Sequence, residues 1–229
     1  MPVSMFQASI PVFSRGLTVI STLLAKAVSH ASQLGLDPVS LVEGRLAPDM
    51  LTLAGQVQRA SDTVRFSAAR LAGERAPSFA DDEASFNELQ QRITKTIAYL
   101  KTIRPEALEG SETREIGMFS GENRRVFRGD AYLLTYALPN FFFHVATAHD
   151  ILRHKGVAIG KRDYLGPYEG EHHERALSAP SKKSFSSVNS PIFAWSDFKS
   201  TVGAAGPALA SDPNIPAAPP RSCAFHCVI

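Results

Sequence analysis

Apolar residues recur every three or four positions along four long segments, and this spacing predicts four helices. The first helix runs from about residue 9 to residue 34, with Pro11 in its first turn and Gly35 at its end. If residues 4–9 form an earlier helical turn, Pro11 would instead sit at a kink. A short helical turn over residues 37–44 follows, because Asp37-Pro38 opens it and Gly44 ends it.

The second helix is predicted to run from about Asp49 to Ala72, and Gly73 ends it. Pro48 blocks an earlier start, and the Asp49 carboxylate can accept the free N–H groups of the first turn. The third helix begins between Asp81 and Ser85 and closes before Pro105. Both helices carry one apolar stripe, formed by Leu53, Val57, Ala60, Val64, Ala68 and Leu71 in one and by Phe86, Leu89, Ile93, Ile97 and Leu100 in the other.

Residues 113–129 break the helical period, and their short apolar runs around residues 120–123 predict a β-hairpin. A hairpin is marginally stable alone, so we expect it to pack on the helices. The fourth helix follows from about Asp130 to His154, with Gly156 as its stop. Pro139 lies inside it and should bend the axis, because proline removes one backbone hydrogen bond.

Four helices of this length predict an all-α fold, a four-helix bundle with a small hairpin before its last helix. The composition changes after Gly166, where proline, serine and alanine become frequent and apolar periodicity is lost. Such a segment cannot bury enough apolar surface to offset its ordering entropy. We therefore predict a bundle domain over residues 1–166 and a mostly disordered tail over residues 167–229.

The composition argues against some classes of function but does not identify a particular one. The chain is 44% hydrophobic and 20% charged, and its formal charge is +2, too small to indicate a nucleic-acid groove or an anionic membrane as partner. We see no uninterrupted apolar run of membrane-spanning length. Cys223 and Cys227, near the end of the sequence, are the two cysteines, so we expect no disulfide framework. These features predict a soluble, cytoplasmic protein that binds neither nucleic acid nor membrane.

His144 is the main candidate for chemistry. The fourth helix also carries His149 and His154, but a metal-binding pair on a helix needs a spacing of three or four, and here the spacing is five. His144 shares an inward, mostly apolar face with Asn140. It is either a core histidine with a hydrogen-bond partner, or a pocket residue that acts as a base, a metal ligand or a ligand-orienting donor.

The second helix offers partners for His144. Gln56 and Asp49 are predicted to lie on one flank of its apolar stripe, seven residues apart and nearly aligned. We therefore take Asp49, Gln56 and Asn140 as candidate ligand-binding residues beside His144 as the candidate catalytic residue. The alternatives are that Asp49 is only the N-cap and that Gln56 is a polar flank residue. Asp62 is expected to point outward, where arginines can pair with exposed carboxylates.

Several segments together resemble the DUF1993 family, which is grouped with the DinB/YfiT-like proteins. The resemblance covers residues 1–166 in order. It rests on Ala8-Ser9-Ile10-Pro11-Val12-Phe13, Arg45-Leu46-Ala47-Pro48-Asp49-Met50, Gln56-Val57-Gln58, Ala69-Arg70-Leu71-Ala72-Gly73, Leu138-Pro139-Asn140-Phe141-Phe142-Phe143-His144, Ile151-Leu152-Arg153-His154 and Gly160-Lys161-Arg162-Asp163-Tyr164-Leu165-Gly166.

The resemblance implies a four-helix bundle that is often dimeric, so we expect a homodimer. Many DinB-like proteins hold a divalent metal with three histidines, one on the second helix and an H-x-x-x-H pair on the fourth. Here His144 can match one ligand, but Ala148 stands four residues later and residues 49–72 contain no histidine. The three-histidine site is therefore absent, and a weak metal site would have to use Asp49, Gln56 and His144, although an amide oxygen is a poor ligand for zinc or nickel.

Three hypotheses about function remain open at this point. The protein is an enzyme acting on a small molecule through His144, a non-catalytic small-ligand-binding bundle without the metal, or a structural dimer in which His144 only satisfies a core hydrogen bond. The family grouping favours the enzyme, although the sequence contains no complete catalytic constellation.

Overall fold

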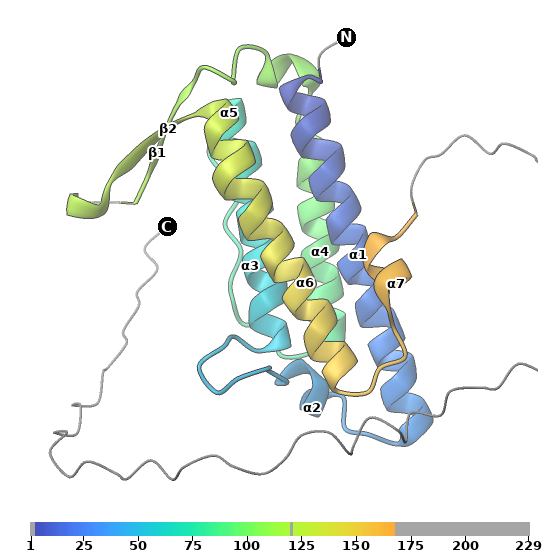
Figure 1. Ribbon diagram of the computed structural model, residues 1–229. Helices are drawn as coiled ribbons and strands as arrows, with labels where there is room; N and C mark the ends of the chain where they lie inside the picture. The colour runs from blue at the N-terminus through green and yellow to red at the C-terminus, as the bar shows by residue number, and fades with distance from the viewer. Residues whose placement is uncertain (1–2, 120, 168–229) are drawn as a thin grey trace, which may run out of the picture. The chain divides into compact units, whose positions relative to one another are not determined.

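A computed structural model of the protein describes residues 3–119 and 121–167. Four long helices pack side by side in this part of the chain (Figure 1), and they confirm the predicted all-α bundle. They are α1 (Met5–Leu34), α3 (Leu53–Ala72), α4 (Phe86–Leu100) and α6 (Leu138–His154). The shorter helices are α2 (Val39–Val42), α5 (Gly129–Tyr132) and α7 (Lys161–Leu165). The tail predicted to be disordered lies outside the described residues, apart from Pro167.

Helix α1 begins earlier than the first residue predicted for it. Ser4 is its N-cap, and a capping box joins Ser4 and Gln7, so the backbone N–H groups of the first turn are satisfied by side chains. Pro11 lies inside the continuous helix. Gly35 ends it in the left-handed conformation, as its position in the sequence indicated.

Helix α3 begins later than predicted, and the expectation that Asp49 is its N-cap was wrong. The hydroxyl of Thr52 accepts the N–H of Gly55 at 3.2 Å and caps the helix instead. The segment before it is folded into turns that bring the Leu53 N–H onto the Gly44 carbonyl at 2.8 Å. The helix can therefore start only after this loop has closed, and Asp49 stays in an exposed turn.

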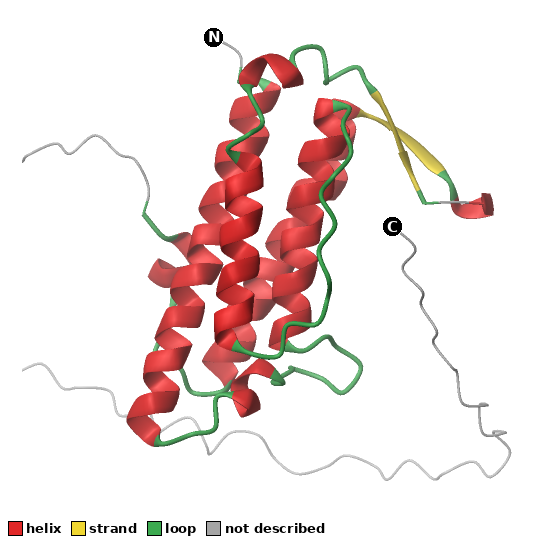
Figure 2. Cartoon of the chain, turned by 180° about the vertical axis from the view of Figure 1, so that it is seen from behind, coloured by secondary structure: helices red, strands yellow, loops and turns green. Residues whose placement is uncertain are grey.

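A crossover loop, residues 73–85, runs back along the bundle from the end of α3 to the beginning of α4 (Figure 2). Its contacts show the direction: Pro77 is bound by Arg65, Asp81 by Arg59 and Glu83 by Gln58. Residues later in the loop thus contact residues earlier in α3, so the loop runs antiparallel to α3. The consequence is that α3 and α4 are parallel neighbours, and Ser85 caps α4 where the loop ends.

The predicted hairpin is present as β1 (Glu115–Met118) and β2 (Arg125–Arg128), paired antiparallel with Ile116 opposite Phe127. It projects from one end of the bundle (Figure 1). Phe127 packs its ring against Tyr132 and Tyr136 at the start of the last long helix, at centroid distances of 6.2 and 6.3 Å. These aromatic contacts supply the support that a lone hairpin lacks.

The chain around Pro139 changes helical type. Residues 133–137 form a π-helical turn between α5 and α6, and Pro139 is in the first turn of α6. Proline cannot donate the hydrogen bond that a continuous α-helix needs there, and a wider turn accommodates the missing donor. The predicted irregularity at Pro139 therefore takes the form of a π turn just before it.

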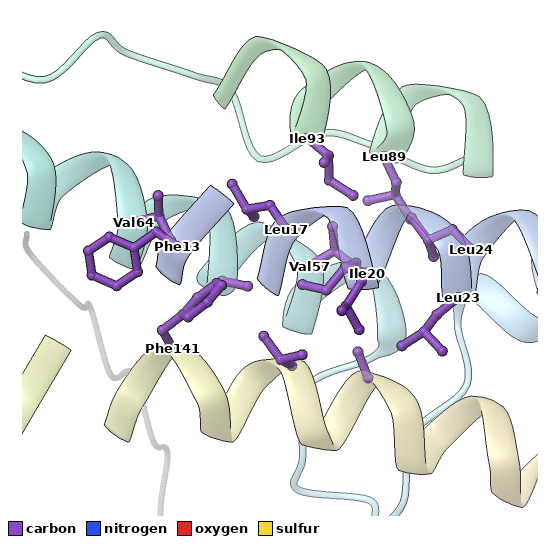
Figure 3. Packing of buried hydrophobic residues seen from close by; sticks show 14 of the residues in the cluster. Phe13, Leu17, Ile20, Leu23, Leu24, Val57, Val64, Leu89, Ile93 and Phe141 are labelled. Carbon is purple, nitrogen blue, oxygen red and sulfur yellow. The ribbon is translucent and has the colours of Figure 1, made fainter. Parts of the chain in front are cut away.

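The core lies between the four long helices (Figure 3). Phe13 and Phe141 meet edge to face with their centroids 5.4 Å apart, and both are fully buried. Phe13, Leu17, Ile20, Leu23 and Leu24 reach in from α1, Val57 and Val64 from α3, and Leu89 and Ile93 from α4. The stripes predicted from the sequence thus face one another.

Helix α1 is long and apolar enough to cross a membrane by length and composition alone, with a mean hydropathy of 1.4 over an 18-residue window. This differs from our expectation that no segment of the chain qualifies. Half of that window is buried inside the bundle, since Leu17, Ile20 and Leu24 belong to the core. Core packing therefore accounts for the buried half of this window.

The contact between α1 and α6 predicts the effect of Gly16→Ala. An added Cβ would lie 2.4 Å from Cε1 of the buried Phe141 ring, so we expect the free energy of unfolding to fall by about 1–3 kcal/mol. Denaturant unfolding with an unchanged m-value measures this loss. Gly117→Ala, where an added Cβ meets nothing within 4 Å, is the control, and an equal loss in both variants would contradict the packing argument.

Candidate functional site

His144 of α6 and Gln56 of α3 meet across the interface between the two helices. Nδ1 of His144 lies 2.8 Å from Oε1 of Gln56. Gln56 is 2% exposed, and its Nε2 donates to the Leu51 carbonyl at 3.4 Å. The sequence analysis chose this pair, and the structure brings the two side chains together.

The hydrogen bond determines which ring nitrogen of His144 carries the proton. Because Gln56 donates through its Nε2 to a backbone carbonyl, its oxygen faces the imidazole, and Nδ1 of His144 must donate. In the neutral ring Nε2 is then left with its lone pair. Nε2 of His144 has no hydrogen-bond partner among the described residues. Unlike Nε2 of His149, which also lacks a partner, it is not completely buried. A free acceptor therefore reaches the surface.

Burial lowers the pKa of His144 to about 4, with a smaller effect of the positive charge of Arg59. The ring is thus neutral at physiological pH. In the unfolded chain an imidazole titrates near its ordinary value of 6.5, so the unfolded state binds more protons between pH 4 and 6.5. His144 consequently makes the fold less stable as the pH falls through that window.

The other two candidates do not join the pair. Asn140 lies one turn before His144, but its Nδ2 donates to Oγ1 of Thr63 at 2.7 Å and fixes α6 to α3 there. Asp49 is exposed and makes no hydrogen bond or ion pair to Gln56 or His144 within the described chain. The arrangement is therefore a dyad, His144 and Gln56, with Asn140 as a neighbour that serves packing.

The residues present do not fit the three-histidine metal site that the sequence resemblance implied. Gln56 has committed its oxygen to the His144 N–H, so it is not free to bind a metal as well. Within residues 3–119 and 121–167, no three His, Cys, Asp or Glu side chains come together in a way that could hold a metal ion.

A buried network of charges connects α3, α4 and the crossover loop. The Asp62 carboxylate binds Arg65 and Arg92, both at 2.6 Å, and Arg92 also binds Glu83 at 2.9 Å. Asp62, Arg65 and Arg92 are only 4, 3 and 2% exposed. Burial alone would lower the pKa of Arg92, but the bond to Glu83 and the nearby negative charges raise it above its ordinary value, so the guanidinium stays charged.

This network corrects the expectation that Asp62 points outward and that the arginines near it serve exposed carboxylates. Helical periodicity on α3 alone could not reveal it, because Arg92 comes from α4 and Glu83 comes from the loop. The guanidinium of Arg65 also stacks between the rings of Phe66 and Phe79, at 4.2 and 4.8 Å from their centroids. A run of acidic residues, Asp81-Asp82-Glu83, was the only signal in the sequence.

Three surface clefts accompany these elements. One of about 680 Å³ lies between α3 and the crossover loop, and one of about 350 Å³ lies between that loop and α4. The third, of about 580 Å³, is mostly apolar and lies where α1, α2 and α4 meet. His144 lines none of the three.

A family model called "Domain of unknown function (DUF1993)" matches residues 5–165, most of the part of the chain described above. The chain belongs to the DUF1993 family. This confirms the resemblance found in the sequence, and it places the dyad, the charge network and the crossover loop inside the family domain.

A solved structure supports the wider grouping. The crystal structure of a DinB family member protein from Shewanella denitrificans is 34% identical to the chain, with a TM-score of 0.69. The similarity covers 72% of this chain and 95% of that one. The DUF1993 chain therefore has the DinB-like fold, and no curated protein matches it significantly.

The proton assignment at His144 predicts its reactivity with diethyl pyrocarbonate, which acylates unprotonated imidazole nitrogen. Between pH 7 and pH 5.5 an ordinary imidazole of pKa 6.5 loses about eightfold in its neutral fraction, whereas His144 stays neutral. Peptide mass spectrometry, with N-acetylhistidine as internal reference, should show nearly constant His144 labelling over this range. A parallel decline of both would contradict the lowered pKa, and no labelling would contradict a reachable Nε2.

The charge network predicts that Asp62→Asn destabilises the fold strongly. The change leaves Arg65 and Arg92 buried beside a neutral group, which should reduce the free energy of unfolding by about 3 kcal/mol. The matched control is Asp82→Asn in the crossover loop, an exposed position where we expect a change within about 0.5 kcal/mol. Similar urea midpoints for the two variants would show that the network does not hold the loop.

Proposed function

We propose that this DUF1993 protein binds a small molecule on the α3–α6 face, where Nε2 of His144 accepts a hydrogen bond from it. The observation that supports this is the 2.8 Å bond between His144 Nδ1 and Gln56 Oε1, which leaves Nε2 unprotonated, and residues 3–119 and 121–167 offer Nε2 no hydrogen-bond partner. Gln56 is the positioning residue, because its buried amide selects the tautomer and the ring orientation. The molecule bound should therefore carry an O–H, N–H or S–H donor.

The low pKa favours binding over acid–base catalysis. An efficient general base has a pKa near the working pH, and an imidazole with a pKa of about 4 takes up a proton only weakly at pH 7. As a neutral acceptor, however, it keeps its role over the whole physiological range. The same lowered pKa separates His144 from a charged surface histidine.

An enzyme remains the second candidate, and the oriented dyad is the observation in its favour. A base held by a buried partner, with its free nitrogen open to solvent, is the arrangement that proton abstraction requires. In that case activity would depend on a group titrating near pH 4 rather than near 6.5. A pH–rate profile on any molecule found to bind separates the two candidates.

Thermal unfolding with a panel of small hydrogen-bond donors tests the proposal. A ligand well above its Kd should raise the Tm of the wild-type chain by about 2–4 °C and lose this effect in His144→Gln. Gln56→Leu should weaken the effect, because the ring loses its orienting partner.

His154→Gln, at an exposed histidine of the same helix, is the matched control and should respond like the wild type. Ligands that stabilise His144→Gln equally would exclude the proposed site. Elemental analysis gives an independent check, since one divalent metal per chain that disappears in His144→Gln would replace the acceptor role with a metal ligand role.

We also propose that the protein is a cytoplasmic homodimer. The DinB-like fold and three exposed apolar side chains support the dimer, namely Leu134 in the π turn, Phe143 on α6 and Val126 on the hairpin, each more than half exposed. Light scattering of the purified chain would show a mass near 50 kDa for a dimer and near the 24.8 kDa of one chain otherwise.

A further inference from the structure

The cleft of about 680 Å³ between α3 and the crossover loop has walls of unusual chemistry. Three arginines, Arg65, Arg70 and Arg75, line it together with the rings of Phe66 and Phe79. The acidic residues along it are Asp62, Glu74 and Asp81. Formal charges alone would therefore balance, and the binding properties depend on which of these groups already have partners.

The ion pairs of the network already neutralise Asp62, Asp81 and Arg65 of the cleft. Asp62, Asp81 and Glu83 are matched by Arg59, Arg65 and Arg92 in a set of ion pairs that balances three against three. What remains along the cleft is Arg70 and Arg75 against Glu74, whose carboxylate accepts a hydrogen bond from Tyr99 at 2.8 Å. One positive charge is left over.

Arg70 is held in place without being neutralised. Its Nη1 donates to the hydroxyl of the fully buried Tyr132 at 3.2 Å, and its guanidinium carbon lies 5.4 Å from the Phe66 centroid. No carboxylate forms an ion pair with Arg70 or with Arg75 in the described part of the chain. A guanidinium that is fixed by neutral partners and keeps free N–H groups is suited to an incoming anion.

The end of α3 does not oppose an anion at this place. Helix C-termini repel negative charge through their free carbonyl groups. Here the carbonyls of Ala69 and Arg70 accept the N–H groups of Glu74 and Gly73, and the Leu71 carbonyl accepts from Arg114. These three carbonyls are therefore not free to repel an anion bound beside Arg70 and Arg75.

We infer that this cleft binds a small organic anion, a carboxylate or phosphate group attached to a flat apolar body. Arg70 and Arg75 receive the anionic group, and the exposed parts of Phe66 and Phe79 contact the flat body. The site is distinct from the His144 dyad and does not depend on the function proposed for it.

Calorimetric titration of the full chain with phenyl phosphate tests this inference. Arg70→Gln should weaken binding about tenfold, since it removes a charge-assisted contact. It should still fold, because the Tyr132 hydroxyl keeps its bond to Ser67 at 2.9 Å. Arg75 forms no side-chain hydrogen bond or ion pair in the described part of the chain, and Arg75→Gln should weaken binding roughly threefold, as expected for an exposed charge.

Control variants and a second ligand test whether binding depends on this cleft and on the type of anionic group. Arg104→Gln removes an exposed arginine outside the cleft and, like His144→Gln, should bind phenyl phosphate as the wild type does. Benzoate in place of phenyl phosphate distinguishes a carboxylate from a phosphate preference, and both results support an organic anion.

Three results would overturn the inference. They are equal affinity of Arg70→Gln and Arg104→Gln for phenyl phosphate, binding of phenol as tight as that of phenyl phosphate, and no binding of either anion at millimolar concentration. Equal binding of inorganic phosphate would remove the flat body from the assignment and thus also contradict it.

Discussion

The pair of contacts that the Asp62 carboxylate makes with Arg65 and Arg92 is the interaction on which the arrangement of this bundle depends. It ties α3 to α4 and fixes the crossover loop, because Arg65 also binds the Pro77 carbonyl and Arg92 the Ala80 carbonyl. Two parallel helices need a long connection, and a long connection needs partners for its backbone. Buried arginines with several donors each can supply them, while the carboxylates neutralise the charge.

The same network shapes both faces of α3. On one side it pairs with Asp81 and Glu83 of the crossover loop and leaves Arg70 and Arg75 opposed only by Glu74 along the cleft. On the other side Arg59, which binds Asp81 at 2.6 Å, adds to the low pKa of His144. Helix α3 thus borders the neutral acceptor of His144 on its α6 side and the cationic cleft on its loop side.

The sequence predicted the bundle, the hairpin and the inward position of His144, since each follows from the local spacing of apolar residues. It also identified Gln56 as a partner of His144, because helical periodicity shows which side chains of α3 and of α6 face the bundle interior. It misplaced Asp49, because the loop closure between Gly44 and Leu53 is a tertiary event. It missed the burial of Asp62, since the partners of that carboxylate lie 30 residues away on α4 as well as on its own helix.

The π turn before Pro139 sets the rotational phase of everything that follows it on α6. Such a turn holds one residue more than an α-helical turn, so shortening it by one residue would rotate the downstream helix by about 100°. His144 would then face away from Gln56, and Phe141 would leave its place beside Phe13. Family members with a one-residue deletion here would have to rebuild both the core and the dyad, which makes the length of this segment a marker for DUF1993 chains that share the same site.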